Sequence, residues 1–262
     1  MKITILTVAL FSVFSIQACE AEGNKTKKNT SCEKSCKHDE ANSLDITLKS
    51  GKVIEIAFAT IEGGKEAELS ENYFPKILPL AAKYGGKMLG SFQVLAITGG
   101  EIQPQMVAIF EWPSVDAQKQ LLADKKAQKL FSIRDAALTS IQLAYYEVEE
   151  DVTVSFQKDK TYEFFNAWLT PESKTALPEY FKQSEAPKLK YGPPKFVASL
   201  KPLINVPNES FILQPQMAGI VEWNNVATYY GLVADPDFKK ASPLLEKSVR
   251  RLDMIQTRIN MP

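Results

Sequence analysis

The chain has 262 residues, of which 45% are apolar and 24% charged, a composition typical of folded globular domains and not of disordered or fibrous proteins. Lys plus Arg and Asp plus Glu each total 31, so the formal net charge is zero and the chain lacks the basic surplus of proteins that bind the nucleic-acid backbone. We therefore expect no nucleic acid among its partners. The single histidine and the three cysteines all lie at or before His38, which excludes catalysis by Cys or His from the rest of the chain.

Residues 1–18 have the pattern of a signal peptide. Lys2 precedes an apolar segment, residues 3–16, that is short for a membrane span and typical of a signal-peptide core. It is followed by Gln17-Ala18-Cys19, and the whole resembles the lipobox of bacterial lipoproteins. The resemblance implies cleavage after Ala18 and acylation of Cys19, which would anchor the protein in the cell envelope, on the periplasmic side or at the outer membrane. The alternative is a secreted protein released by the ordinary signal peptidase.

Residues 19–50 are rich in polar residues and poor in large apolar ones, so we predict a flexible tether. Within it, Cys32, Cys36 and His38 form a C-x3-C-x-H cluster. Two thiolates and an imidazole are ligands for a soft metal ion, so the cluster indicates either metal capture or a disulfide between Cys32 and Cys36. An oxidising compartment favours the disulfide, because acylation of Cys19 leaves an even number of thiols.

An internal repeat organises the rest of the chain. Residues 103–112 (QPQMVAIFEW) and 214–223 (QPQMAGIVEW) are identical at seven of ten positions. Upstream matches occur at a spacing four residues shorter, which places an insertion in the second half around residues 205–211. We therefore predict two domains of usual size, residues 51–150 (the first copy) and residues 151–262 (the second copy).

Each copy is predicted to have the order strand, helix, strand, strand, helix, strand. In the first copy, residues 53–61 indicate a strand, and apolar residues three to four apart over residues 69–84 indicate a helix that Pro75 and Pro79 bend or break. Strands are expected at residues 88–98, 105–112 and 141–148, with helical segments after Ser114 and Asp124. This order is the ferredoxin-like βαββαβ motif of an α+β fold.

The first copy has three motifs: Tyr84-Gly-Gly-Lys-Met-Leu, the segment of residues 109–117 around Glu-Trp, and an Asp before the last helix. The second copy keeps them as Tyr191-Gly192, residues 220–226 around Glu-Trp, and residues 234–238. Together they resemble an uncharacterised bacterial branch of the dimeric α/β-barrel superfamily, over about residues 52–260. Members of that superfamily pair two four-stranded sheets around a cavity, so the resemblance implies that the two copies pair within one monomeric chain. Such pairing would bury the sheet face that the helices leave uncovered.

Alternation along the strands indicates which side chains face the predicted cavity. Met106, Ala108, Phe110 and Trp112 form an apolar set that is expected to pack on the helices, and the intervening residues are expected to face the barrel interior. By this reasoning the candidates for binding a ligand inside the barrel are Gln105, Gln142, Tyr146, Gln216, Glu55 and Glu163. Asp253 is also expected to face inward.

Glu111 and Glu222 are the candidate catalytic residues, because opposing carboxylates in a confined space acquire raised pKa values suited to acid–base chemistry. The alternative is that both are solvated residues at strand ends that pair with a lysine or cap a helix.

These features predict a lipid-anchored protein that binds a small, partly apolar molecule in the barrel cavity. The resemblance also implies an enzyme alternative, because several members are monooxygenases or act on haem. The haem-degrading members have a Trp and a His where this chain has Leu121 and Phe131 in the first copy, and Leu232 and Ser242 in the second, so no cofactor is expected. A cofactor-independent oxygenase or isomerase, using Glu111 or Glu222 as base, is the enzyme hypothesis, and metal capture by the tether is a further alternative.

Overall fold

The computed structural model describes residues 42–204, 206 and 211–261. The signal peptide, Cys19, and the cluster of Cys32, Cys36 and His38 lie outside the described residues, so the predictions made for them stay predictions. Two successive sets of elements have nearly the same order. The first set is β1 (Ser43–Leu48), β2 (Val53–Ile61), η1 (Glu68–Tyr73), α1 (Phe74–Lys83), β3 (Lys87–Gly99), β4 (Met106–Trp112), α2 (Val115–Ala123), α3 (Lys125–Ala137) and β5 (Leu138–Glu147). The second set is β6 (Val152–Gln157), β7 (Thr161–Leu169), α4 (Ser173–Lys190), β8 (Lys195–Pro202), β9 (Met217–Trp223), α5 (Val226–Ala234), α6 (Pro236–Ser248) and β10 (Val249–Ile259).

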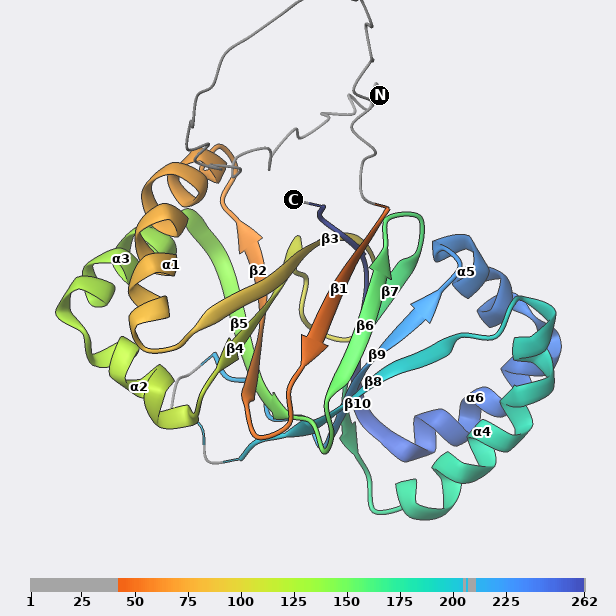
Figure 1. The fold of residues 1–262 in the computed structure, drawn as a ribbon. Coiled ribbons are helices and arrows are strands. Elements are labelled where there is room, and N and C mark those ends of the chain that lie inside the picture. Colours follow the sequence, from red (N-terminus) through yellow and green to blue (C-terminus); the bar gives the residue numbers. More distant parts are fainter. Residues whose placement is uncertain (1–41, 205, 207–210, 262) are drawn as a thin grey trace, which may run out of the picture.

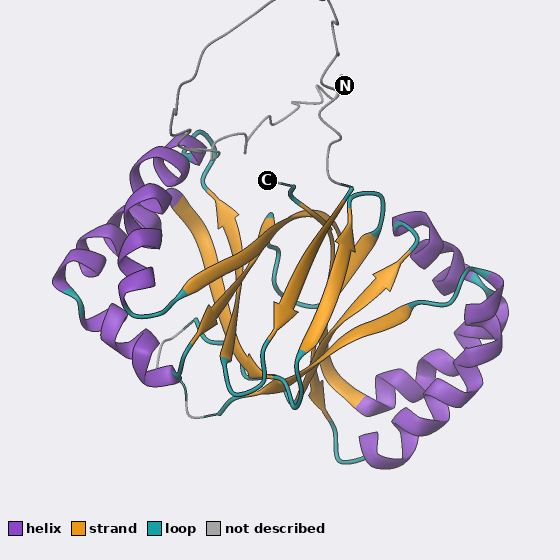
Figure 2. Ribbon diagram, in the orientation of Figure 1, coloured by secondary structure: helices purple, strands orange, loops and turns teal. Residues whose placement is uncertain are grey.

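Eight of these strands close into a barrel in the order β10-β3-β4-β2-β5-β8-β9-β7, and the neighbours are antiparallel. Each copy contributes four adjacent strands, and the copies join where β3 pairs with β10 and where β5 pairs with β8. The helices of the first copy cover one side of the barrel and those of the second copy cover the opposite side (Figures 1 and 2). The fold is therefore α+β, with two ferredoxin-like units that pair their sheets into one barrel, as the sequence predicts.

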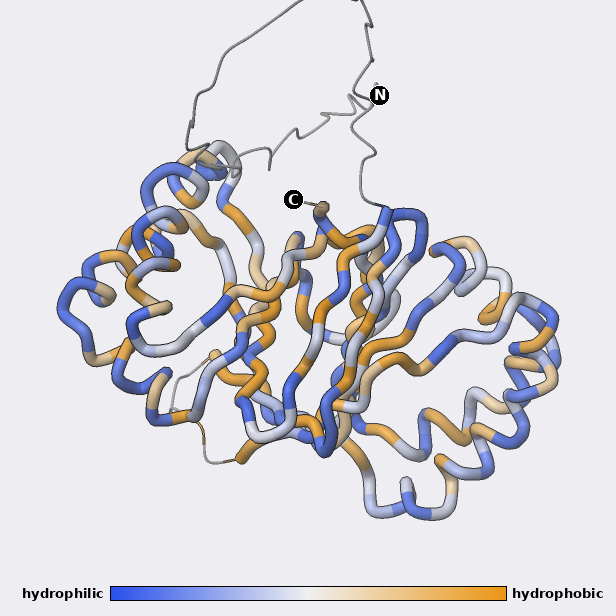
Figure 3. Tube along the Cα trace, in the orientation of Figure 1, coloured by the Kyte–Doolittle hydropathy of each residue, from blue (hydrophilic) through white to orange (hydrophobic). Residues whose placement is uncertain are grey.

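Large apolar side chains fill the interior of the barrel. Phe58, Phe92, Phe164 and Tyr162 are almost completely buried there, and the ring centroids of Phe92 and Phe164 lie 5.0 Å apart. An eight-stranded barrel is just wide enough for side chains to fill it. Figure 3 shows the hydrophobic positions concentrated along these central strands. The predicted cavity inside the barrel is therefore wrong, because this space is a packed core.

Strands β1 and β6 form a separate two-stranded antiparallel ribbon across the barrel (Figure 1). Ile46, Leu48, Val154 and Phe156 alternate onto one face of the ribbon and belong to the same buried core as the barrel interior. The prediction of a flexible tether as far as residue 50 is therefore wrong for residues 43–48, which form a strand. The alternation of apolar side chains at residues 44, 46 and 48 was a signal for this strand, but its partner lies about a hundred residues further along the chain.

The helices of the first copy begin and end as the sequence predicts. Residues 68–83 change from the π-helical η1 to α1 at Phe74, and Pro75 lies in the first turn of α1, where its missing N–H costs no hydrogen bond. Ser114 and Asp124 cap α2 and α3 with side-chain oxygens that accept backbone N–H groups. The last strand begins at Leu138, three residues earlier than predicted.

Candidate functional site

A cavity of about 290 Å³ lies on the helix side of the sheet in the first copy. Its floor is the outer face of β2, β4 and β5, including Ala57, Ala59 and Ala108, and its walls come from η1, α1, α2 and α3. The small alanine side chains leave space between the sheet and the helices, and Leu69, Ile77 and Leu121 surround it with apolar surface. A cavity of this size is close to the lower limit for small-molecule sites in proteins.

Glu55 brings a carboxyl group into this apolar cavity. It is only 8% exposed, and its Oε2 accepts a hydrogen bond of 3.0 Å from Trp112 Nε1. The Tyr145 hydroxyl also hydrogen-bonds Glu55, and Gln118 Nε2 donates to that hydroxyl over 2.9 Å. Gln118 Oε1 is buried without a protein partner. The cavity therefore has a hydrogen-bonded carboxyl group beside an amide oxygen that no protein donor satisfies.

Burial raises the pKa of Glu55 from 4.5 to about 7, and the hydrogen bonds from Trp112, Tyr145 and Gln118 and the charge of Arg134 reduce this shift only in part. A carboxyl group with a pKa near 7 exchanges a proton readily near neutral pH. Glu55 can therefore act as a hydrogen-bond donor when protonated and as a proton acceptor when ionised.

A second polar group of the cavity is the Arg134 guanidinium on α3. Its side chain is 14% exposed, pairs with Asp135 over 2.8 Å, and hydrogen-bonds the Tyr73 hydroxyl. Burial raises the pKa of Tyr73 to about 12, so this phenol stays protonated at neutral pH. The cavity thus has a fixed cation paired with a carboxylate on its helical wall, in addition to Glu55 on its floor.

The second copy supplies one wall of the first copy's cavity. Phe211, in the connection between β8 and β9, lines the cavity, and its carbonyl oxygen accepts a hydrogen bond of 3.0 Å from Leu143 N. Leu213 N donates to Leu143 O over 2.7 Å, and Leu203 N donates to Tyr145 O over 2.8 Å. The described residues on either side of the predicted insertion are therefore fixed along β5, beside the cavity.

Glu55 and Glu163 do not face the barrel interior, so their predicted orientation is wrong. Glu55 pairs with Phe110 across strands and shares its face with Trp112, on the helix side. Glu163 lies on the helix side of the second copy, where its Oε2 accepts 3.2 Å from Gln256 Nε2. The larger alternate set of β2, with Ile54, Ile56 and Phe58, faces inward because the barrel interior requires large side chains.

Tyr146, Gln142 and Asp253 face inward as predicted, but none of them lines the described cavity. Tyr146 donates a hydrogen bond to Asn166, and Gln142 lies opposite the inward-facing Phe58. Asp253 is completely buried and forms a two-point ion pair with Arg251 through contacts of 2.7–3.2 Å. Tyr146 and Asn166 link the two copies within the core, and Asp253 links them by accepting a hydrogen bond of 2.8 Å from Glu101 N.

Gln105 and Gln216 bind backbone in the same way in the two copies. Gln105 Oε1 accepts a hydrogen bond of 3.1 Å from Ile61 N, and Gln216 Oε1 accepts one of 2.8 Å from Leu169 N. Both glutamines are therefore engaged with the end of the neighbouring strand, which explains their place in the repeated QPQM segment.

Glu111 and Glu222 lie near the ends of β4 and β9, and neither lines the cavity. Glu222 pairs with Lys195 over 3.2 Å and accepts 3.4 Å from the Tyr162 hydroxyl. Glu111 is half-buried opposite Lys87 on β3. The Lys195 contact agrees with the part of the alternative in which a strand-end glutamate pairs with lysine, but the Glu222 side chain is only 11% exposed and so is not solvated. The predicted catalytic role is not tested by this arrangement, and neither glutamate borders the described cavity.

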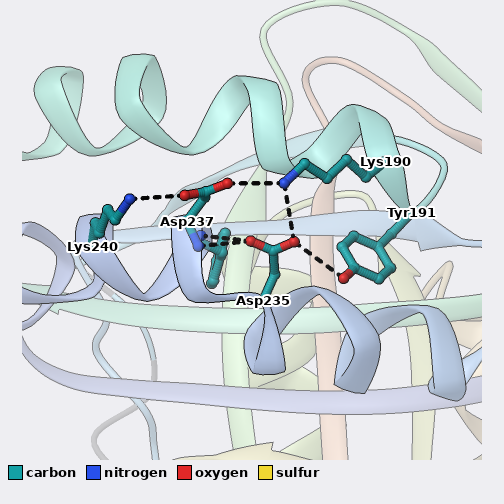
Figure 4. Close-up of polar contacts among 6 residues, drawn as sticks. Lys190, Tyr191, Asp235, Asp237 and Lys240 are labelled. Carbon is teal, nitrogen blue, oxygen red and sulfur yellow. Dashed lines mark hydrogen bonds and ion pairs between the residues drawn. The ribbon is translucent and has the colours of Figure 1, made fainter.

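The repeated Tyr-Gly and Asp motifs join helix ends. In the second copy, Asp235 caps α6 and accepts 3.1 Å from the Tyr191 hydroxyl and 3.3 Å from Lys190 (Figure 4). In the first copy, the Tyr84 hydroxyl donates to Asp124 over 2.8 Å. The Tyr-Gly and Asp motifs therefore stabilise the fold and do not line the cavity, whereas the Glu-Trp segment supplies Phe110 and Trp112 to it.

Solved structures with a similar arrangement were found across most of the chain. An anthrone oxidase-like protein is 14% identical, with a TM-score of 0.50, over 84% of this chain and 92% of that one. This likeness is one of fold, two ferredoxin-like sheets paired into a dimeric α/β barrel. A mutant chlorite dismutase from Candidatus Nitrospira defluvii is 10% identical over 80% of this chain and 92% of that one, with a TM-score of 0.47. A proposed monooxygenase from Lactobacillus acidophilus is 13% identical over 79% of this chain and 93% of that one, with a TM-score of 0.38. No family model matches the sequence, and no curated protein matches it significantly.

Sequence reasoning did not identify Gln118, Arg134 or Tyr145 as site residues of this dimeric α/β barrel. The available signal was Trp112, which the alternation of β4 placed on the helix side. Once β2 and β4 are paired, Glu55 falls on the same side as Trp112. The pairing of the two strands, rather than their individual patterns, was the missing step.

Two further observations concern the described residues. None of the helices found there is long and apolar enough to cross a membrane. Within the same part of the chain, no group of three His, Cys, Asp or Glu side chains is arranged to hold a metal ion.

Proposed function

We propose that this protein binds a small, mostly apolar molecule with at least one polar group in the cavity of the first copy. The observation that supports this most directly is the buried carboxyl group of Glu55 at a mostly apolar cavity of about 290 Å³. Apolar walls favour an aromatic or aliphatic body, and the Glu55 carboxyl group favours a hydroxyl or amine that donates a hydrogen bond.

Native mass spectrometry tests whether such a molecule is carried. The protein purified gently from its source cells is compared with the same protein refolded from denaturant. A mass excess present only in the first sample supports binding, and its identification gives the chemical class of the ligand. Naphthol, which has an aromatic body and one hydroxyl group, serves as a probe of the proposed ligand class. Equal masses, together with no detectable binding of naphthol to the refolded protein, would contradict the proposal.

The second candidate function is cofactor-independent proton transfer, as in an oxygenase or isomerase. It is favoured by one observation, the pKa of about 7 that burial gives to Glu55 beside the cavity. In this hypothesis ionised Glu55 takes a proton from the bound molecule, and Tyr145 and Trp112 hold the carboxylate in place.

The variant Glu55→Gln separates the two functions, because Gln resembles the protonated carboxyl group but accepts no proton. A binding protein would keep its affinity within a few-fold, whereas an enzyme would lose turnover by about a hundredfold or more. Glu111→Gln removes the base predicted from the sequence. Turnover that fell with Glu111→Gln and not with Glu55→Gln would contradict the assignment of Glu55.

We also propose that the protein is a monomer attached to the cell envelope by acylated Cys19. The support is the apolar segment and the lipobox-like residues that end at Cys19. The variant Cys19→Ala should move the protein from the detergent phase to the aqueous phase in a partition experiment. Incorporation of labelled fatty acid into that variant would contradict the proposal.

Metal capture by the tether can be tested by deleting residues 20–41 and measuring metal binding. The deletion stops at residue 41 because residues 43–48 belong to the fold.

A further inference from the structure

The two copies can be compared position by position, because equivalent hydrogen bonds join equivalent residues. The contact of Gln105 with Ile61 corresponds to that of Gln216 with Leu169. By this alignment Glu163 corresponds to Glu55 and Trp223 to Trp112, and both pairs lie on the helix side of the sheet. Glu163 is also buried, 5% exposed. The second copy therefore keeps the carboxyl group and the tryptophan of the cavity.

The floor of the cavity differs between the copies at several positions, among them Phe110, which corresponds to Val221, and the central Ala57. Ala57 of the first copy corresponds to Phe165 of the second, and Phe165 is buried, 8% exposed. Directly opposite it on β9 is Gly219, which corresponds to Ala108. A Cβ atom on Gly219 would lie 2.7 Å from Ala198 O and from Phe196 Cζ and 2.9 Å from Phe165 Cε1, so the glycine leaves room for the neighbouring strand and for both rings. The Phe and the Gly form a complementary pair that fills the space left open by two alanines in the first copy.

The polar groups of the cavity differ as well. Arg134, Gln118 and Tyr145 correspond to Leu245, Tyr229 and Gln256. Trp112 Nε1 donates to Glu55, whereas Trp223 Nε1 is buried without a protein partner. The second copy thus has neither the open floor nor the hydrogen-bond network that surrounds Glu55.

The second copy instead contributes to the cavity of the first through Phe211. Its carbonyl oxygen is fixed to β5 by Leu143 N, and the Phe211 side chain lines the cavity. The cavity of the first copy is therefore assembled from both halves of the chain.

We propose that the first copy alone binds the ligand, that Phe165 closes the equivalent space of the second copy, and that the second copy serves as a wall and a scaffold. This inference rests on the proposed function for the ligand, but the open and closed spaces can be tested without it. Residue 57 and its counterpart 165 are then the residues that decide which copy binds.

Xenon tests the spaces themselves, because it enters apolar cavities whatever their natural ligand. Crystals of the full chain under xenon pressure should show xenon beside Ala57 and none beside Phe165. The variant Phe165→Ala should add a second xenon site in the second copy and leave the first unchanged. Xenon in both copies of the unaltered protein, or no second site in Phe165→Ala, would overturn the inference.

Naphthol tests the ligand in the same proteins. Fluorine NMR of a fluorinated naphthol should show one bound molecule per chain, Ala57→Phe should weaken this binding at least about tenfold, and Phe165→Ala should keep the affinity of the first site within about twofold. If xenon occupies the first copy alone but naphthol does not bind, the ligand class of the proposed function fails and the difference between the copies stands. If Ala57→Phe fails to fold, Phe165→Ala still decides the inference.

Discussion

Two buried carboxyl groups dominate the chemistry at the residue scale. Burial raises the pKa of Glu55 and of Glu163 to about 7 each, from 4.5. The folded state therefore keeps protons that the unfolded state releases between about pH 4.5 and about pH 7. Both groups contribute most to stability below the lower value, and the contribution is lost as the pH rises through the upper one.

The double variant Glu55→Gln with Glu163→Gln should remove this decrease in the free energy of unfolding with rising pH. In urea denaturation, the free energy of unfolding of the unaltered protein should fall by about 2–3 kcal/mol for each carboxyl group between about pH 5 and about pH 8. The double variant should show a much smaller fall. An equal fall in both proteins would mean that neither carboxyl group titrates near neutral pH.

Trp112 and Trp223 offer a matched pair of substitutions at the same scale. Trp112 hydrogen-bonds Glu55 and lowers its pKa, whereas Trp223 Nε1 has no protein partner. Trp112→Phe should therefore raise the pKa of Glu55 further, by about one unit, and Trp223→Phe should leave the pKa of Glu163 nearly unchanged. Carbon NMR of labelled glutamate carboxyl groups measures both, and equal shifts would contradict the difference between the two sites.

At the scale of elements, the β1–β6 ribbon completes the core of the barrel. Phe156 is 1% exposed and its ring contacts Phe92 and Tyr162, with centroids 4.9 Å and 4.6 Å away. Phe156→Ala should therefore lower the free energy of unfolding by about 3–5 kcal/mol. Thr153, on the outer face of the same strand, contacts only the exposed Thr47 hydroxyl in the described hydrogen bonds, so Thr153→Ala should cost less than about 0.5 kcal/mol. Similar losses for the two variants would show that the ribbon does not pack as described.

At the scale of the whole molecule, neither copy has a complete core of its own. The inner faces of both sheets share one cluster of buried side chains. The backbone N–H and C=O groups at the edge of β3 find their hydrogen-bond partners on β10, in the other copy. Residues 42–150 expressed alone should therefore be unfolded or self-associated, and coexpression with residues 151–262 should restore a soluble complex. The complete chain should sediment with the mass of a monomer. A folded monomer of either half, or a dimer of the complete chain, would contradict this account.

The sequence by itself determined the local elements of the two ferredoxin-like units and their order, but not the β1–β6 ribbon. The period of apolar residues, the caps at Ser114 and Asp124, and the repeated QPQM segment depend on near neighbours or on similarity between segments, so they can be read without coordinates. They were enough to predict the ferredoxin-like order, whereas the pairing of the two sheets was implied by the resemblance to the dimeric α/β-barrel superfamily.

Only the tertiary structure decided which face of the sheet holds the cavity. Strand alternation defines two faces but does not say which one points inward, and the barrel selects the larger set for its interior because that space must be filled. Glu55 consequently lies with Trp112 on the helix side, and Phe211 reaches the cavity from the other copy. The difference between Ala57 and Phe165 is visible in the sequence, but its meaning depends on the space around each side chain.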